Sequence, residues 1–154
     1  MPLSPCSRRV TRPAATFESK LSMILVVDDD PRIRFLLRMT LEPEGHEVVE
    51  AADVESALLL AGPDRLPDVI TTDLDLPRLG GAALIRRLRS EPRTASIPIV
   101  VVSANHSAAE ELHVTGLVEA IVTKPFKPSL LTSCIQSVIG GRLGAPGSDS
   151  KPAA

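Results

Sequence analysis

The chain alternates short apolar runs with amphipathic stretches, and this pattern limits the possible folds more than any other feature. Residues 23–27 form an unbroken apolar run, and residues 97–102 are rich in β-branched side chains. Further strand candidates are residues 47–51, 68–72 and 120–122. Apolar strands separated by helices of roughly ten residues predict a parallel sheet with helices on both faces. We therefore expect a doubly wound α/β protein whose ligands bind beyond the carboxyl ends of the strands.

Helix start signals lie between the predicted strands. Asp30 followed by Pro31 offers an N-cap and a first helical residue, and Asp53 can cap the next helix. Ser107 and Glu110 form a capping box that predicts a helix to about residue 113. Other helices are expected over 82–89 and from Pro128. The helix positions expected to face the core are Ile33, Leu36, Leu37, Thr40, Leu41, Val54, Ala57, Leu58, Ala61, Leu84, Ile85, Leu88, Leu131, Cys134, Ile135 and Val138.

Composition divides the chain into one domain and two tails. Residues 1–22 hold four basic residues, one acid and three prolines, which predicts a disordered basic arm. The arm lacks the apolar stretch of a secretory signal, while a transit peptide and a translation start at Met23 remain alternatives. From Arg142 the composition turns to Gly, Pro, Ser and Ala, which predicts a disordered tail over 141–154. The ordered domain is expected over 23–140.

Charge and composition exclude several function classes. The segment 23–140 carries 17 acidic and 11 basic residues, a sign that disfavours binding to a nucleic-acid duplex. Aromatic residues make up 2% of the chain, too few for a base-stacking platform. No apolar run approaches the roughly 18 residues that a membrane span needs, so membrane insertion is not expected. Cys6 and Cys134 show no disulfide or metal spacing, which favours a reducing, cytoplasmic setting. The three histidines and the three arginines of the 82–89 helix are interpreted as surface residues.

Charged and hydroxyl side chains follow the predicted strands where these end. The first strand ends in three aspartates, Asp28 to Asp30, and the third is followed by Asp73 and Asp75. Ser103 follows the fourth strand and Lys124 the fifth. Parallel strands end at one edge of a sheet, so these side chains should converge. Carboxylates beside a hydroxyl and an ammonium group suit a site for Mg²⁺ and a phosphoryl group together, where an aspartate oxygen could act as nucleophile.

Four segments resemble the receiver domain of bacterial two-component response regulators, in particular single-domain, chemotaxis-regulator-like members. The resemblance covers residues 23–140 and rests on motifs in the family's order. It implies a flavodoxin-like, five-stranded sheet in the order 2-1-3-4-5, with helices on both faces. The segments that carry it are ILVVDDDP (24–31), TDLDLP (72–77) with Gly81, VSA (102–104) and TKPF (123–126).

The resemblance assigns a role to each residue at the strand ends. Asp73 is expected to accept a phosphoryl group, and Mg²⁺ is expected on Asp28, Asp29, Asp73 and the backbone carbonyl of Asp75. Asp30 is then expected to cap the following helix rather than to bind metal.

Two phosphoryl contacts and two departures complete the resemblance. Ser103 would hydrogen-bond one phosphoryl oxygen and Lys124 would pair with another, and the bond from Lys124 to Pro125 should be cis. The fifth strand carries Ile121 where relatives usually have an aromatic switch residue, and Gly80 stands where an acid often precedes the glycine.

The expected function is that of a stand-alone response regulator without enzymatic turnover beyond self-phosphorylation and self-dephosphorylation. Its phosphoryl donor would be a sensor histidine kinase or a phosphotransfer protein. It would signal to an unknown downstream protein by non-covalent contact or by onward phosphoryl transfer, without direct nucleic-acid binding. One alternative is a receiver-like binding module that never takes phosphate. A haloacid-dehalogenase-like phosphatase shares the Asp-x-Asp motif, but there that motif ends the first strand, whereas here it follows the third.

Overall fold

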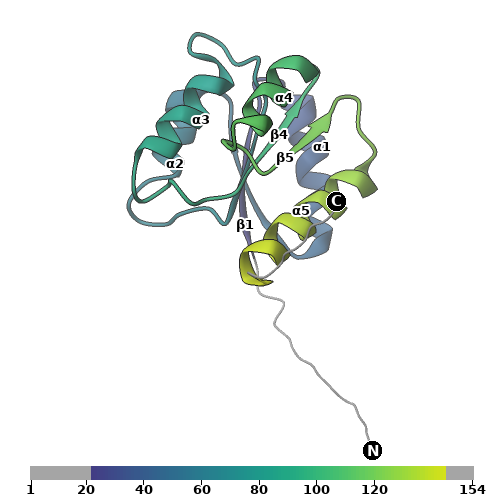
Figure 1. The fold of residues 1–154 in the computed structure, drawn as a ribbon. Coiled ribbons are helices and arrows are strands. Elements are labelled where there is room, and N and C mark those ends of the chain that lie inside the picture. Colours follow the sequence, from purple (N-terminus) through teal and green to yellow (C-terminus); the bar gives the residue numbers. More distant parts are fainter. Residues whose placement is uncertain (1–21, 145–154) are drawn as a thin grey trace, which may run out of the picture.

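Five parallel strands in the order β2-β1-β3-β4-β5 form the centre of the fold, as expected (Figure 1). The structure is a computed structural model that describes residues 22–144. The order and the helices between strands confirm the flavodoxin-like, doubly wound fold. The expected disorder of residues 1–21 and 145–154 lies outside the described residues. The last helix continues to Gly144, beyond the expected domain end at residue 140.

The described elements follow the predicted alternation of strand and helix. The strands are β1 (Met23–Val27), β2 (Glu47–Ala51), β3 (Val69–Thr72), β4 (Ile99–Ser103) and β5 (Ala120–Thr123). The helices are α1 (Pro31–Leu41), the short 3-10 helix η1 (Glu42–Glu44), α2 (Val54–Leu60), α3 (Gly80–Ser90), α4 (His106–Val114) and α5 (Pro128–Gly144). Among the described helices, none combines the length and the apolar composition needed to cross a bilayer.

Helices cover both faces of the sheet (Figure 1), and an apolar core lies on each face. On one face Val54, Leu84 and Leu112 bring α2, α3 and α4 against the sheet. On the other face Leu37 and Leu131 bring α1 and α5 against it. Because both faces are covered, the strands are apolar almost throughout, and the polar residues that remain buried lie mainly at the carboxyl ends of the strands.

Two strands begin later than the sequence predicts. We expected β3 from Asp68, but the strand begins at Val69: the Asp68 amide still donates to the Met23 carbonyl, while the Met23 amide donates to the Asp68 carboxylate. We expected β4 from Ile97, but the Ile97 amide donates to Thr94 in a turn, and Pro98 has no amide proton for a ladder. Both strands still end where their polar residues were predicted to emerge.

The start of α4 corrects the predicted capping box. The helix begins at His106, and its N-cap is Asn105, whose side-chain oxygen accepts from the Ala108 amide at 3.2 Å. Ser107 therefore lies inside the first turn rather than before it. Asp30 and Asp53, by contrast, cap α1 and α2 as predicted.

Arg89 is not on a solvated face, which corrects a second expectation. Its guanidinium donates to the carbonyls of Ala95, Ile97 and Leu117 and pairs with Glu119. The side chain is 14% exposed. A guanidinium carries five donors in a planar fork, so one arginine can join the loop before β4 to the loop before β5.

Two further burial predictions were wrong in part. Leu36 is exposed, whereas Leu37 and Leu41 are buried, so the apolar face of α1 is narrower than expected. His46 is half-buried rather than on the surface, and burial lowers the pKa of its imidazole.

Candidate functional site at the carboxyl edge of the sheet

The polar residues at the strand ends converge. Carboxylate oxygens of Asp28, Asp29 and Asp73 all lie within 4.8 Å of one another. The Lys124 ammonium donates to Asp28 Oδ2 at 2.8 Å and to Asp73 Oδ2 at 2.9 Å. We call these four residues the acidic site. It joins the ends of β1, β3 and β5, as the topology rule predicts.

The Asp73 carboxylate is held in one orientation. Its Oδ1 atom accepts from the amide of Leu74 at 2.7 Å and from that of Asp75 at 3.3 Å. Its own amide donates to the Val27 carbonyl, which continues the ladder between β3 and β1 past the strand. The residue is 6% exposed. With Oδ1 occupied by amides, Oδ2 is the oxygen that faces Lys124.

Lys124 stands between two buried carboxylates. Burial lowers the pKa of its ammonium, but the hydrogen bonds and charges of Asp28 and Asp73 together outweigh that effect, so the pKa is raised. Lys124 is therefore charged at neutral pH. The peptide bond from Lys124 to Pro125 is cis, as the resemblance implied.

The hydrogen bonds of Asp28 only partly offset the cost of burying its charge. Burial raises the pKa of its carboxyl group, the Asp73 charge adds to this, and the hydrogen bonds from Lys124 and the Asp30 amide offset it only partly. The acidic site holds one ammonium group and three carboxylates, which leaves it with excess negative charge. Such a site is suited to take up a cation.

Ser103 and Asp75 lie at the border of the acidic site. Ser103 is buried and pairs with Thr123 in the sheet, and its carbonyl accepts from the Lys124 amide at 3.0 Å. Its hydroxyl oxygen accepts from the Asn105 amide at 3.1 Å. Asp75 is exposed, and its amide contacts Asp73. The roles assigned to these residues remain predictions.

Gly81 permits the close approach of α3 to Asp73. A Cβ atom at this position would lie 2.0 Å from the Asp73 carbonyl oxygen, closer than any real contact. The Gly81 amide donates to the Leu74 carbonyl at 2.9 Å. The glycine after the Asp73 segment is therefore needed for packing, because any side chain would displace the Asp73 backbone.

The acidic site has the chemistry of a hard-cation site. Carboxylates are the protein ligands that Mg²⁺ prefers, and this ion is usually held by one or two of them plus other oxygens. Asp29 is exposed whereas Asp28 and Asp73 are buried, so the three acids fit an ion that keeps one side open to solvent. The residues present therefore fit a magnesium ion.

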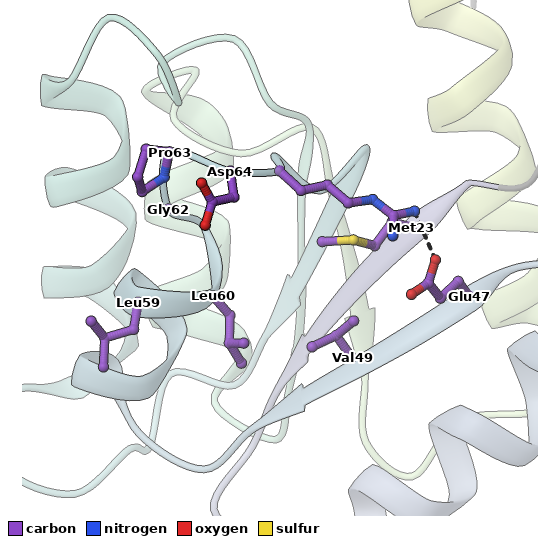
Figure 2. A pocket seen from close by; sticks show the side chains of 9 residues that line it. Met23, Glu47, Val49, Leu59, Leu60, Gly62, Pro63 and Asp64 are labelled. Carbon is purple, nitrogen blue, oxygen red and sulfur yellow. Dashed lines mark hydrogen bonds and ion pairs between the residues drawn. The ribbon is translucent and has the colours of Figure 1, made fainter.

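A shallow pocket of about 260 Å³ lies at the opposite, amino edge (Figure 2). Met23, Val49 and Leu60 line it beside the ion pair between Arg65 and Glu47, whose nitrogen and oxygen are 2.7 Å apart. None of its lining residues belongs to the acidic site.

The sequence interpretation missed one residue beside the acidic site. Arg34 donates from Nη1 to the Asp28 carbonyl at 2.7 Å and from Nε to Glu50 on β2 at 2.9 Å. A signal was present, because Arg34 is spaced three and seven residues before Leu37 and Leu41, which are buried against the sheet.

A comparison with protein families identifies the family of this domain. The model of the response regulator receiver domain matches residues 24–136. The chain belongs to this family. As a receiver, it is of a kind that works with histidine kinases and is typically not an enzyme apart from transfer to itself.

Known receivers resemble this one in sequence and in structure. The phosphate regulon transcriptional regulatory protein PhoB of Pseudomonas aeruginosa is 35% identical over 84% of this chain and 56% of its own length. The chemotaxis response regulator CheY4 of Vibrio cholerae superposes with a TM-score of 0.70 at 29% identity, over 77% of this chain and 99% of that one.

A third relative bears on the acidic site. The receiver domain of a sensor histidine kinase from Pseudomonas aeruginosa matches with a TM-score of 0.71 at 29% identity, over 79% of this chain and 99% of that one. That structure has a magnesium ion coordinated in its active site cleft. The receiver described here spans about half the length of the curated relatives it matches.

Proposed function

We propose that this receiver accepts a phosphoryl group on Asp73 from a phosphohistidine of a sensor histidine kinase or phosphotransfer protein. An Asp73 carboxylate oxygen forms a bond to phosphorus while the bond from phosphorus to the histidine nitrogen breaks, and that nitrogen keeps the electron pair. The observation that carries the proposal is the orientation of Asp73. Backbone amides hold Oδ1, and Oδ2 faces the Lys124 ammonium at 2.9 Å.

Lys124 and Ser103 would receive the transferred group. Lys124 would exchange its contact with Asp73 for one with a phosphoryl oxygen while it keeps Asp28 as a partner. The Ser103 hydroxyl oxygen accepts from Asn105, so its own proton is available to donate to a second phosphoryl oxygen. Both contacts place positive charge or a donor where the added negative charge develops.

Mg²⁺ bound in the acidic site would neutralise charge between the carboxylates and the incoming phosphoryl group. The residues proposed to hold it are Asp28, Asp29, Asp73 and the backbone carbonyl of Asp75. The phosphorylated receiver would then act on a downstream protein by contact or by onward transfer. We propose no direct nucleic-acid contact for this domain, because its 23–140 segment is acidic.

The test uses acetyl phosphate with Mg²⁺ and intact-mass measurement. The wild-type chain should gain one phosphoryl group and Asp73→Asn none. Asp64→Asn is the matched control, because Asp64 is exposed at the opposite, amino edge of the sheet and should leave labelling in place. Labelling of Asp73→Asn at the wild-type level would contradict the assignment. A wild-type chain that takes neither a phosphoryl group nor Mg²⁺ would favour a binding module that works by contact alone.

A further inference from the structure

The peptide group between Asp28 and Asp29 joins two of the carboxylates in the acidic site. Its carbonyl oxygen accepts from Arg34 Nη1 at 2.7 Å. A peptide group is planar, so a fixed carbonyl direction restrains the backbone torsions on both sides of it. Those torsions set the directions in which the Asp28 and Asp29 side chains leave the backbone. A contact at this carbonyl therefore restrains the backbone that carries both carboxylates.

Arg34 is itself held from the neighbouring strand. Its Nε atom donates to Glu50 Oε1 at 2.9 Å, and the second oxygen of Glu50 accepts from Arg38 Nε at 2.7 Å. Arg38 also pairs with Glu42. We call Arg34, Arg38, Glu42 and Glu50 the α1–β2 ion-pair network. The Arg34 side chain is 18% exposed, and its planar fork spans Glu50 and the Asp28 carbonyl together.

The other groups of Asp28 already have partners. Its amide donates to the Ala51 carbonyl at 3.1 Å, and its Oδ1 atom accepts from the Asp30 amide at 2.9 Å. Arg34 adds the contact at the carbonyl, where β1 has ended and α1 has not begun. From this arrangement we propose that Arg34 is a positioning residue, which orients Asp28 and Asp29 for the metal ion and so supports the function proposed above.

Charge and geometry predict opposite effects for the loss of Arg34. If the guanidinium acted only through its charge, its removal would leave the acidic site more negative, and Mg²⁺ would bind more tightly. If it acts through the carbonyl, its removal frees the peptide group, and Mg²⁺ binds more weakly. Loss of partners that orient metal ligands typically weakens metal binding roughly 10-fold or more.

Arg38 provides a matched control on the same helix. It pairs with the same Glu50 carboxylate and carries the same charge, and its described contacts are with Glu50 and Glu42. Calorimetric titration with Mg²⁺ should give a dissociation constant about 10-fold higher for Arg34→Met than for the wild type. Arg38→Met should bind as the wild type does or slightly more tightly. In amide spectra, Mg²⁺ should shift Asp29 and Asp30 less in Arg34→Met than in Arg38→Met.

A conservative variant covers the case in which Arg34→Met does not fold. Arg34→Lys keeps the positive charge but has one nitrogen, which cannot contact Glu50 and the Asp28 carbonyl in a fork. It should also bind Mg²⁺ more weakly than Arg38→Met. Affinity in Arg34→Lys equal to the wild type, or an equal loss in Arg38→Met, would overturn the inference. A wild type that binds Mg²⁺ but takes no phosphoryl group would overturn the proposed function and leave the role of Arg34 in place.

Discussion

The acidic site and the α1–β2 ion-pair network lie on either side of the Asp28 peptide, and their charges are balanced differently. In the network two arginines face two glutamates, Glu42 and Glu50. The acidic site holds three aspartates and one lysine, which pairs with Asp28 and Asp73. The pKa values of Glu50 in the network and of Asp28 in the acidic site are shifted in opposite directions. Hydrogen bonds from Arg38, and then from Arg34, hold the pKa of Glu50 below its usual range, whereas burial raises the pKa of Asp28.

The difference indicates that the α1–β2 ion-pair network stabilises the fold, whereas the acidic site is arranged for a ligand. Glu50 contributes stability above its unfolded pKa, and that contribution is lost as the pH falls through its lower folded pKa. Asp28 has the opposite sign: its contribution is present below its unfolded pKa and is lost as the pH rises through its higher folded pKa. At neutral pH the ionised Asp28 carboxylate therefore costs stability, which a bound cation would restore.

The largest effect should come from removing the one cation of the acidic site. Lys124→Met leaves Asp28 and Asp73 buried without a counter-ion, and should lower the free energy of unfolding by about 3 kcal/mol at pH 7 without Mg²⁺. Urea unfolding measures this, and Mg²⁺ should recover part of the loss. The control is Lys127→Met, since Lys127 is exposed. If Lys124→Met lowered the free energy of unfolding as little as Lys127→Met, the proposed difference between the acidic site and the α1–β2 ion-pair network would be wrong.

A smaller effect of opposite sign is expected from Asp28→Asn. The amide keeps the acceptor for Asp30 but carries no charge, so the cost of burying the carboxylate is removed and the free energy of unfolding at pH 7 without metal should rise by about 1 kcal/mol. The gain should shrink as the pH falls towards 3.8, the usual pKa of aspartate, because the wild-type carboxyl then becomes protonated. Thermal melts between pH 4 and 7 would show it. A destabilised variant would mean that Lys124 compensates Asp28 fully.

The smallest effect is expected in the α1–β2 ion-pair network, where the charges balance. Glu50→Gln should lower the free energy of unfolding by roughly 0.5 to 1 kcal/mol at pH 7, because the partly exposed ion pairs are screened by water. The wild type and the variant should become equally stable as the pH falls below 4.5, the usual pKa of glutamate. Urea unfolding at several pH values tests this. A difference that grew at low pH would contradict the lowered pKa of Glu50.

Most of the fold could be predicted because the strands are buried on both faces. Their apolar runs are unambiguous, and the bounds of β1 and β2 were predicted correctly. Convergence of Asp28, Asp73 and Lys124 followed from the rule that parallel strands end at one edge. What these residues do in phosphoryl transfer stays a prediction for the experiments above.

The arginines were the harder residues, since their partners are distant in sequence. Arg89 bonds carbonyls as far away as Leu117, and Arg34 bonds Glu50 on another element. A helical pattern gives the direction of a side chain but not what it meets there. The prediction of Ser107 as the cap of α4 was wrong for a local reason, because Asn105 and Ser107 are both good N-cap residues and the helix begins directly after Asn105.

Arg89 has a practical consequence for altering this protein. The loops before β4 and before β5 lie on the surface, where tags or inserted domains are usually tolerated. Here both loops supply carbonyls to one guanidinium, so an insertion in either would detach the other. The exposed turn around Gly45 is the better place for an inserted domain, because a Cβ atom there would meet nothing within 4 Å; Gly45 itself must stay, since its positive φ would strain any other residue.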